Sequence, residues 1–453
     1  MESSPYSPER RTALVLCGTG AHGVYHAGVL RALEEAGVKI DVVAGHGVGA
    51  ASAALAAIDG GAKLWDSSGI WRGPYVRSLY RWRWPLRAAA WLVLPLIVTL
   101  AARFALIARG STIPPVLLFA PTIVTAAIVF VLAGGLVVAR LRAPVERRAA
   151  GAWWWRLLGA PIDASGAQTL FARAIWDLIR GAAAIKRPDS SALGRRYAEV
   201  LSEGLGQPGF RELMVVVTDV DTRSDIVAAL LREPYRREFT ARRAGRERQA
   251  EVLDLAGLGR DHALDVVAGA LTLPLGTDPH LVTFGRDSYW RGETHRLCDR
   301  PGSLARLLDE LAASGVTQAI VVSAVPVTAG PHRLRTSGLE LRQRVGEFVS
   351  ASEAAARRDA FDSRTMRFEA VYLICPAHNP VGPFDFGGAY DEASDRHQTI
   401  GELMERAYED AYRQFIEPIV GASGENLEGV QQAGGGRRHS AGSTQHAAGS
   451  EPS

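Results

Sequence analysis

The stretch Val42-Val43-Ala44-Gly45-His46-Gly47-Val48-Gly49-Ala50 decides how the first part of this chain can fold. It joins an apolar run to three glycines at alternate positions, and an alanine-rich segment, residues 50–57, follows. A strand that leads through Gly-x-Ser-x-Gly into a helix is a nucleophile elbow, the sharp turn that presents a reactive serine. Here Gly47 stands at the serine position. Glycine adopts the strained turn at the least cost, so Gly47 preserves the turn and removes the nucleophile.

The segments around the elbow predict an α/β fold. Residues 12–16 form a buried-strand pattern, residues 26–36 have helical spacing of apolar side chains, and residues 40–44 form a second strand. A strand-helix-strand-helix order predicts a mainly parallel sheet covered by helices. Further helices are expected at 171–179, 195–205, 263–270 and 400–419, and further strands at 213–217, 319–322 and 368–374.

A second glycine-rich loop, Gly18-Thr19-Gly20-Ala21-His22-Gly23, lies between the first strand and its helix. It has three interpretations. Its backbone N–H groups could hold a dinucleotide pyrophosphate, or form an oxyanion hole for acyl chemistry, or simply close a tight turn. A dinucleotide site favours an acidic residue at the end of the second strand, but Asp41 lies at its start.

Residues 76–148 predict an inserted membrane hairpin. No acidic residue occurs between Asp66 and Glu146, and the segment 110–139 carries no charge. Two apolar spans, at about 86–108 and 113–139, each reach the roughly 20 residues that cross a hydrocarbon core. Arginines flank both outer ends, so the positive-inside tendency puts both flanks in the cytoplasm. Eight of the ten tryptophans lie near these ends: Trp65, Trp71, Trp82, Trp84, Trp91, Trp153, Trp154 and Trp155. A re-entrant hairpin, or a hairpin buried in a larger body, is the alternative.

Composition limits the other classes of protein. The chain has 453 residues, 47% of them hydrophobic, a net charge of +3 and three widely spaced cysteines. These values suit a globular core and argue against a disulfide framework, and no metal site, cofactor or nucleic-acid partner is expected. Residues 421–453 are rich in Gly, Ser and Ala without periodicity, which predicts a disordered tail.

The run Leu16 to Leu30, with Tyr25 followed by Gly28-Val29-Leu30, resembles the opening of the patatin-like phospholipases. The elbow Gly45–Gly49 falls where that family has Gly-x-Ser-x-Gly. The resemblance implies a three-layer patatin-like fold, an oxyanion loop at Gly18, Thr19, Gly20 and Gly23, and a serine paired with an aspartate of a later Asp-Gly-Gly element.

Two positions depart from that family pattern. The serine position is Gly47, and Tyr289-Trp290-Arg291-Gly292-Glu293 aligns best with the later element, which puts Arg291 at the base position. Arg291 cannot accept a proton at ordinary pH. His46, Ser52 and Cys17 are the candidate substitute nucleophiles, but none is expected at the elbow tip beside a base.

The sequence therefore predicts a membrane-anchored, patatin-like protein that has lost catalysis and binds lipid or a protein partner. An active acyl hydrolase with a displaced nucleophile and a nucleotide-binding membrane protein are the alternatives. The expected organisation is a polar leader (1–10), a first part of the α/β domain (11–75), the hairpin insert (76–148), the second part of the domain (149–420) and the tail (421–453). The soluble part is expected on the cytoplasmic side.

Overall fold

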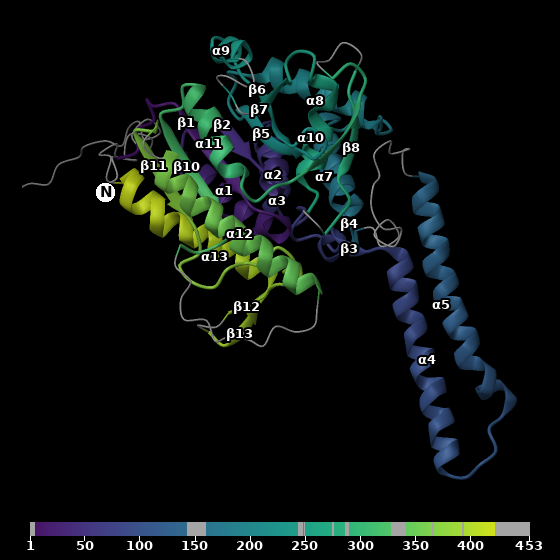
Figure 1. Cartoon of the computed structure of the whole chain (residues 1–453). Coiled ribbons are helices and arrows are strands. Elements are labelled where there is room, and N and C mark those ends of the chain that lie inside the picture. Colours follow the sequence, from purple (N-terminus) through teal and green to yellow (C-terminus); the bar gives the residue numbers. More distant parts are fainter. Residues whose placement is uncertain are drawn as a thin grey trace, which may run out of the picture.

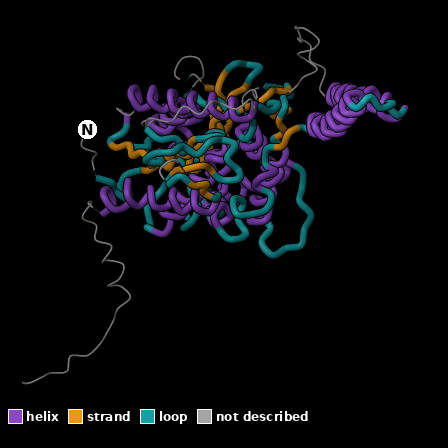
Figure 2. Tube along the Cα trace, turned by 90° about the horizontal axis from the view of Figure 1, so that it is seen from below, coloured by secondary structure: helices purple, strands orange, loops and turns teal. Residues whose placement is uncertain are grey.

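The computed structural model describes residues 5–142, 160–242, 248, 250–273, 276–285, 290–327, 341–364, 367–391 and 394–421. A nine-stranded sheet forms the middle of the body, and helices cover both of its faces (Figure 1, Figure 2). The expected α/β architecture is therefore confirmed. Parts of the predicted leader, hairpin insert, tryptophan belt and tail lie outside the described part of the chain: residues 1–4, 143–148, Trp153 to Trp155 and 422–453.

The centre of the sheet is parallel. Strands β1 (Thr12–Cys17), β2 (Val42–Gly45), β10 (Gln318–Ser323) and β11 (Ala370–Ile374) pair in the order β11-β10-β1-β2. Every residue of β1, β2 and β10 is buried. Near-continuous apolar runs of this kind form strands that are covered on both faces, which explains why these strands were predictable.

The other half of the sheet is mixed. Strand β5 (Glu212–Asp219) pairs parallel with β2 but antiparallel with β6 (Ser224–Leu230) and β9 (Thr294–Cys298). Strand β7 (Ala250–Asp254) runs parallel to β6, and β8 (His280–Thr283) runs antiparallel to β9. Two short pairs complete the strands: β3 (Arg81–Trp82) with β4 (Ile162–Asp163), and β12 (Ala389–Asp391) with β13 (Arg396–Gln398). The sheet is thus mainly parallel with an antiparallel part that was not predicted.

Successive side chains of the central strands point into two separate cores. Leu14 and Leu16 of β1 belong to one hydrophobic cluster, whereas Ala13 and Val15 belong to the other. This alternation is the period of two that a pleated strand imposes. The strands therefore hold two layers of helices, one on each face.

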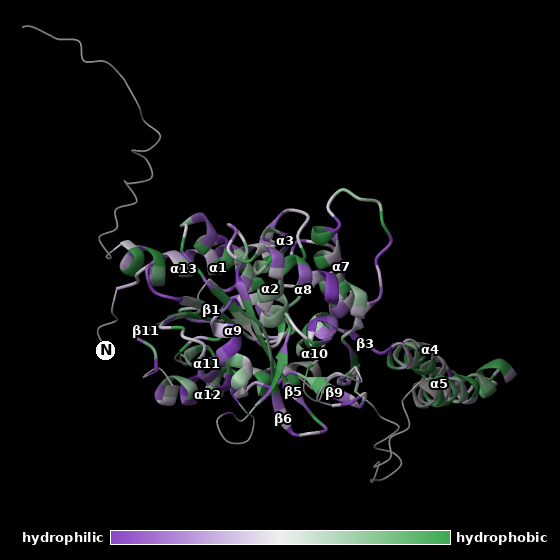
Figure 3. Cartoon of the chain, turned by 90° about the horizontal axis from the view of Figure 1, so that it is seen from above, coloured by the Kyte–Doolittle hydropathy of each residue, from purple (hydrophilic) through white to green (hydrophobic). Residues whose placement is uncertain are grey.

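Among the described residues, seven helices cover the larger core and three cover the smaller core. The first set is α1 (Gly23–Glu35), α2 (Val48–Ala56), α3 (Ala62–Trp65), α7 (Ser165–Ile179), α8 (Ser190–Gly204), α10 (Ala263–Ala270) and α13 (Ile400–Ala411), which continues as a π-helix (Tyr412–Val420). The second set is α9 (Tyr235–Ala241), α11 (Ser303–Ala313) and α12 (Leu341–Arg364). Figure 3 shows α1 and α13 on one side of the sheet and α11 and α12 on the other.

Two long helices leave the body as a hairpin. Helices α4 (Trp84–Ala108) and α5 (Pro115–Arg142) pack against each other and project away from the sheet (Figure 1). Both are long and apolar enough to cross a membrane. Large apolar side chains such as Trp91, Phe104 and Phe130 are exposed on their outer faces. In Figure 3 much of both helices has the colour of hydrophobic residues.

A buried ion pair ties the start of β1 to the start of β5. The guanidinium of Arg11 donates two hydrogen bonds to Glu212, at 2.8 and 2.9 Å, and the two side chains are only 7% and 3% exposed. Arg232 adds a contact to the same carboxylate at 3.2 Å. Because a buried charge needs its partner, this pair fixes the starting ends of β1 and β5, which lie opposite the elbow.

We expect Arg11→Met to lower the free energy of unfolding by about 3–5 kcal/mol, because it leaves the Glu212 carboxylate buried without its bidentate partner. The matched control is Arg196→Met, whose exposed contact with Glu199 at 3.4 Å should contribute about 0.5 kcal/mol or less. Thermal unfolding of the purified variants measures both. Equal losses for the two variants would contradict the structural role of Arg11.

Candidate functional site

The elbow has the backbone of a nucleophile turn. Gly47 follows β2 and precedes α2, with φ 58° and ψ −136°. A Cβ on Gly49 would lie 1.9 Å from the carbonyl oxygen of Leu16, and a Cβ on Gly45 would lie 2.4 Å from Gly49. Both outer glycines are therefore needed for the close approach of strand and helix, as the motif predicted.

The space for a side chain at residue 47 is filled. A Cβ on Gly47 would lie 2.2 Å from the carbonyl oxygen of Gly18 and 2.8 Å from Oδ2 of Asp299. The N–H of Val48 donates a hydrogen bond to the same Gly18 carbonyl at 2.8 Å. In elbow hydrolases, the N–H that follows the nucleophile belongs to the oxyanion hole. Here that donor already has an acceptor inside the protein.

The glycine loop is closed in the same way. The N–H of Thr19 donates to Nδ1 of His22 at 3.0 Å, and the N–H of Ala21 donates to the carbonyl of Pro383 at 2.9 Å. A Cβ on Gly20 would lie 2.1 Å from that Pro383 oxygen. The loop thus has the glycines that were predicted for an oxyanion hole, but these two amides donate within the protein.

Five polar side chains meet beside the elbow, and we call them the elbow cluster: Thr19, His22, His46, Asp299 and Glu353. The Thr19 hydroxyl lies 2.6 Å from Oε1 of Glu353 and 3.0 Å from Oδ2 of Asp299. Nδ1 of His46 lies 3.3 Å from Oδ1 of Asp299, and Nδ1 of His22 lies 3.2 Å from Oε2 of Glu353. All five side chains are at least nine-tenths buried.

Burial and pairing set the charges in the elbow cluster. Burial alone would lower the pKa of His46, but its hydrogen bond with Asp299 raises that pKa well above its usual value. Burial alone would raise the pKa of Glu353, but its interaction with His22 lowers that pKa. Pairing within the cluster therefore favours the charged form of Glu353 and of His46.

Asp299, which the sequence did not single out, is the carboxylate beside the elbow glycine. It follows β9 directly and is 1% exposed. Arg291 lies eight residues earlier, is exposed, and has φ 44° before the start of β9. The expectation that residue 291 faces Gly47 is thus corrected: the strand β9 carries the chain from Arg291 to the elbow, and Asp299 arrives there.

Of the other candidate nucleophiles, Ser52 lies apart from a base, whereas the side chain of Cys17 interacts with the His46 imidazole. Ser52 is buried one turn into α2, and its hydroxyl has no hydrogen-bond partner. Cys17 is a buried free thiol at the end of β1, where its carbonyl accepts a hydrogen bond from Nε2 of His26 at 2.9 Å. Across the residues that the structure describes, no group of three or more His, Cys, Asp or Glu side chains is placed to hold a metal ion.

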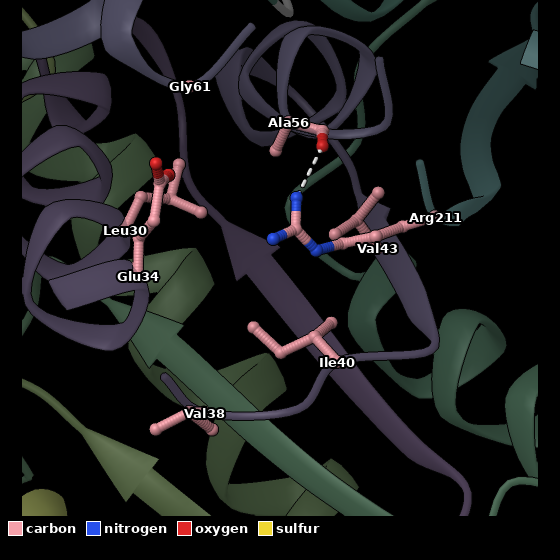
Figure 4. Close-up of a pocket in the computed structure, with 8 residues that line it drawn as sticks. All are labelled: Leu30, Glu34, Val38, Ile40, Val43, Ala56, Gly61 and Arg211. Carbon is pink, nitrogen blue, oxygen red and sulfur yellow. Dashed lines mark hydrogen bonds between the residues drawn. The ribbon is translucent and has the colours of Figure 1, made fainter. Parts of the chain in front are cut away.

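Two cavities lie away from the elbow. One, of about 10 Å³, lies between α1 and β2; Arg211 reaches it and donates to the Ala56 carbonyl at 2.8 Å (Figure 4). That volume is close to the space of a single water molecule. A groove of about 750 Å³ lies along α13 and the β12–β13 pair, and includes Arg72 and Arg406. Neither is lined by a residue of the glycine loop or the elbow.

Comparison with known proteins identifies relatives of the body. Residues 14–334 match the sequence model of a family described as patatin-like phospholipase. Lysophospholipase nte1 of Aspergillus fumigatus is 48% identical over 50 residues, and patatin-like phospholipase domain-containing protein 6 of Mus musculus is 58% identical over 43 residues. These segments cover 11% and 10% of this chain and 3% of each relative.

A solved structure is also similar over much of the chain. VipD from Legionella pneumophila is 17% identical, with 92% of this chain and 68% of that chain covered, and its TM-score is 0.32. The family match contains the glycine loop, the elbow and Asp299, and it ends before α12 begins at Leu341.

The filled space at the elbow predicts that residue 47 tolerates only glycine. We expect Gly47→Ala to destabilise the fold by about 2–4 kcal/mol, because a Cβ would both strain the backbone and displace the Gly18 carbonyl. Gly37→Ala is the control: it has φ +64° but nothing within 4 Å of its Cβ position, so only strain of about 1 kcal/mol remains. Thermal unfolding compares the two variants. A Gly47→Ala variant as stable as Gly37→Ala would show that the elbow has room for a side chain.

Proposed function

Because the chain belongs to the patatin-like phospholipase family, we propose that it is a membrane-anchored member that no longer hydrolyses lipids and acts by binding lipid or a protein partner. The observation that carries the proposal is the Gly18 carbonyl in the space where a nucleophile at residue 47 would stand. Acyl transfer needs an activated nucleophile next to a base, and Gly47 supplies no attacking atom. Fold alone does not imply activity, since function depends on the site.

The retained carboxylate does not by itself restore chemistry. The family resemblance implies an aspartate base, and Asp299 has the position for it beside Gly47. Its oxygens contact the Thr19 hydroxyl and the imidazolium of His46. The amides of Thr19, Ala21 and Val48 are hydrogen-bonded inside the protein, so they do not stabilise an oxyanion in this conformation.

Membrane anchoring rests on the hairpin. Helix α4 has 25 residues, about 38 Å at 1.5 Å per residue, compared with a hydrocarbon core of about 30 Å. Its outer face and that of α5 expose large apolar side chains that water would not favour. Arginines precede α4, and α5 ends in Arg140 and Arg142, which supports a body on the cytoplasmic side.

One contact favours a second candidate function, acyl hydrolysis by a displaced nucleophile. The Thr19 hydroxyl lies 3.0 Å from Asp299, so a hydroxyl and a carboxylate are still paired at the elbow. Thr19 would need a free oxyanion site and access for substrate, yet it is 2% exposed and also contacts Glu353. The closed surroundings therefore favour the non-hydrolytic proposal.

We expect a fluorophosphonate probe to leave the purified full-length protein unlabelled, because no hydroxyl described at the elbow is both activated and accessible. The readout is in-gel fluorescence after prolonged incubation, with a serine hydrolase as a positive control for the probe. Stoichiometric labelling that disappears in Thr19→Ala would instead establish the displaced nucleophile and end the non-hydrolytic proposal.

We expect the hairpin to cross the membrane, so its turn should face the side opposite the body. In intact cells, an impermeant maleimide should label Ser111→Cys in the turn and should not label Ser68→Cys, which is exposed on the body. Both should react after lysis. Protection of both positions in intact cells would favour a re-entrant hairpin, and release of the protein by alkaline carbonate would contradict membrane insertion.

A further inference from the structure

Helix α12 places two charged side chains on the face that it turns toward the body. Its buried positions are Gly346, Val349, Arg357 and Ala360, and the Glu353 side chain lies among them at 9% exposure. This spacing is a single helical face, which usually contains only apolar residues. Burying a charged side chain carries a desolvation cost that apolar packing does not. Glu353 and Arg357 therefore call for an explanation other than stability.

The two charged side chains hold α12 over the carboxyl ends of the central strands. Arg357 donates to the Ser323 hydroxyl at 2.8 Å and to the carbonyls of Val325 and Pro326, just after β10. One turn earlier, Glu353 enters the elbow cluster, where it contacts Thr19 and His22. In parallel α/β sheets, ligands bind outside the carboxyl ends of the strands. Glu353 thus occupies the end of the sheet where a ligand is expected.

The carboxylate of Glu353 is bound as a ligand anion would be. One oxygen contacts the Thr19 hydroxyl at 2.6 Å and the other lies 3.2 Å from Nδ1 of His22. A hydroxyl and an imidazole that converge on one carboxylate, with the imidazolium of His46 nearby, make an anion site. Aromatic side chains flank the loop, since Cβ positions on Gly23 and Gly20 would contact Trp71 and Phe386.

The hydrogen bonds that hold Glu353 cannot all form at the same time. The Thr19 hydroxyl has one proton but faces both Glu353 and Asp299, so it can donate to only one of them. Nδ1 of His22 likewise faces both the Thr19 N–H and Glu353, and it cannot accept from one and donate to the other at once. Nε2 of His22 is buried without a hydrogen-bond partner. Another anion could therefore take the same contacts without adding to these conflicts.

We propose that the elbow cluster is a binding site for the anionic head of a single-chain lipid, and that Glu353 of α12 is an internal substitute that occupies it until such a lipid displaces it. The lipid head, a carboxylate or a phosphate, takes the contacts of Glu353 with Thr19 and His22. Helix α12 lies beyond the residues that match the family model. The inference rests on the proposed non-hydrolytic function and names the ligand of the same site.

The test measures binding of radiolabelled oleate to the full-length protein in phosphatidylcholine nanodiscs, with empty nanodiscs subtracted. Removal of the internal competitor in Glu353→Ala should tighten oleate binding by about ten-fold or more, because the binding-competent state no longer competes with Glu353. Asp359→Ala is the matched control: it removes the same charge from the exposed face of α12 and should bind oleate as the wild type does. If Glu353→Ala does not fold, Glu353→Gln, which keeps the side-chain volume, takes its place.

Two further arms separate the sources of the anion and the roles of α12. Lysophosphatidate tests the phosphate head. Methyl oleate, which has no charge, should bind the Glu353→Ala variant no more tightly than the wild type. In the wild type, bound oleate should speed amide hydrogen exchange in residues 344–353, since α12 must move. Unchanged oleate and lysophosphatidate affinities in the Glu353 variants, or tighter binding without any change in exchange at α12, would overturn the inference. Release of fatty acid from phosphatidylcholine by the wild type would overturn the proposed function instead.

Discussion

The hydrogen bond from the N–H of Val48 to the carbonyl of Gly18 is the contact on which the rest of the site depends. At 2.8 Å it holds the glycine loop against the elbow, and the same carbonyl fills the space beyond Cα of Gly47. The contact needs a residue without Cβ at position 47, in a backbone conformation that residues with a side chain rarely adopt. It also brings Thr19 within reach of Asp299 and Glu353. The geometry of the elbow cluster follows from this one approach.

The sequence predicted the parts of the fold that are buried on both faces. Strands β1, β2 and β10 are continuous apolar runs, and the α10 boundaries, residues 263–270, agree with the helical pattern. Strands β6 to β9 were missed, and β9, Thr-His-Arg-Leu-Cys, shows one reason, since polar residues stand at three of its five positions. Such segments become strands through pairing with β5, a tertiary effect that local patterns do not contain.

The same limit explains the site. The glycine loop and the elbow are local motifs whose backbone demands can be derived from the chain, and Gly18, Gly20 and Gly47 have positive φ in the structure. Asp299 and Glu353 reach the elbow from 252 and 306 residues along the chain, after an unpredicted strand and on a helix outside the family match. An alignment by motif favoured Arg291 because Arg291-Gly292 resembles the start of an Asp-Gly element. Only the path of β9 shows that Asp299, and not Arg291, reaches the elbow.

The glycine at residue 47 and the close approach of the glycine loop can be understood together. With a serine at residue 47, the Gly18 carbonyl could not approach to its present position, because even a Cβ would lie 2.2 Å from it. The loop would then stand away from the elbow, and the Val48 N–H would be free to face a substrate oxygen. Glycine at that position removes the attacking atom and also admits the loop, which brings the Thr19 hydroxyl to Asp299. A buried carboxylate left alone would be costly, so its contacts with Thr19 and His46 are what make the closed site stable without a substrate.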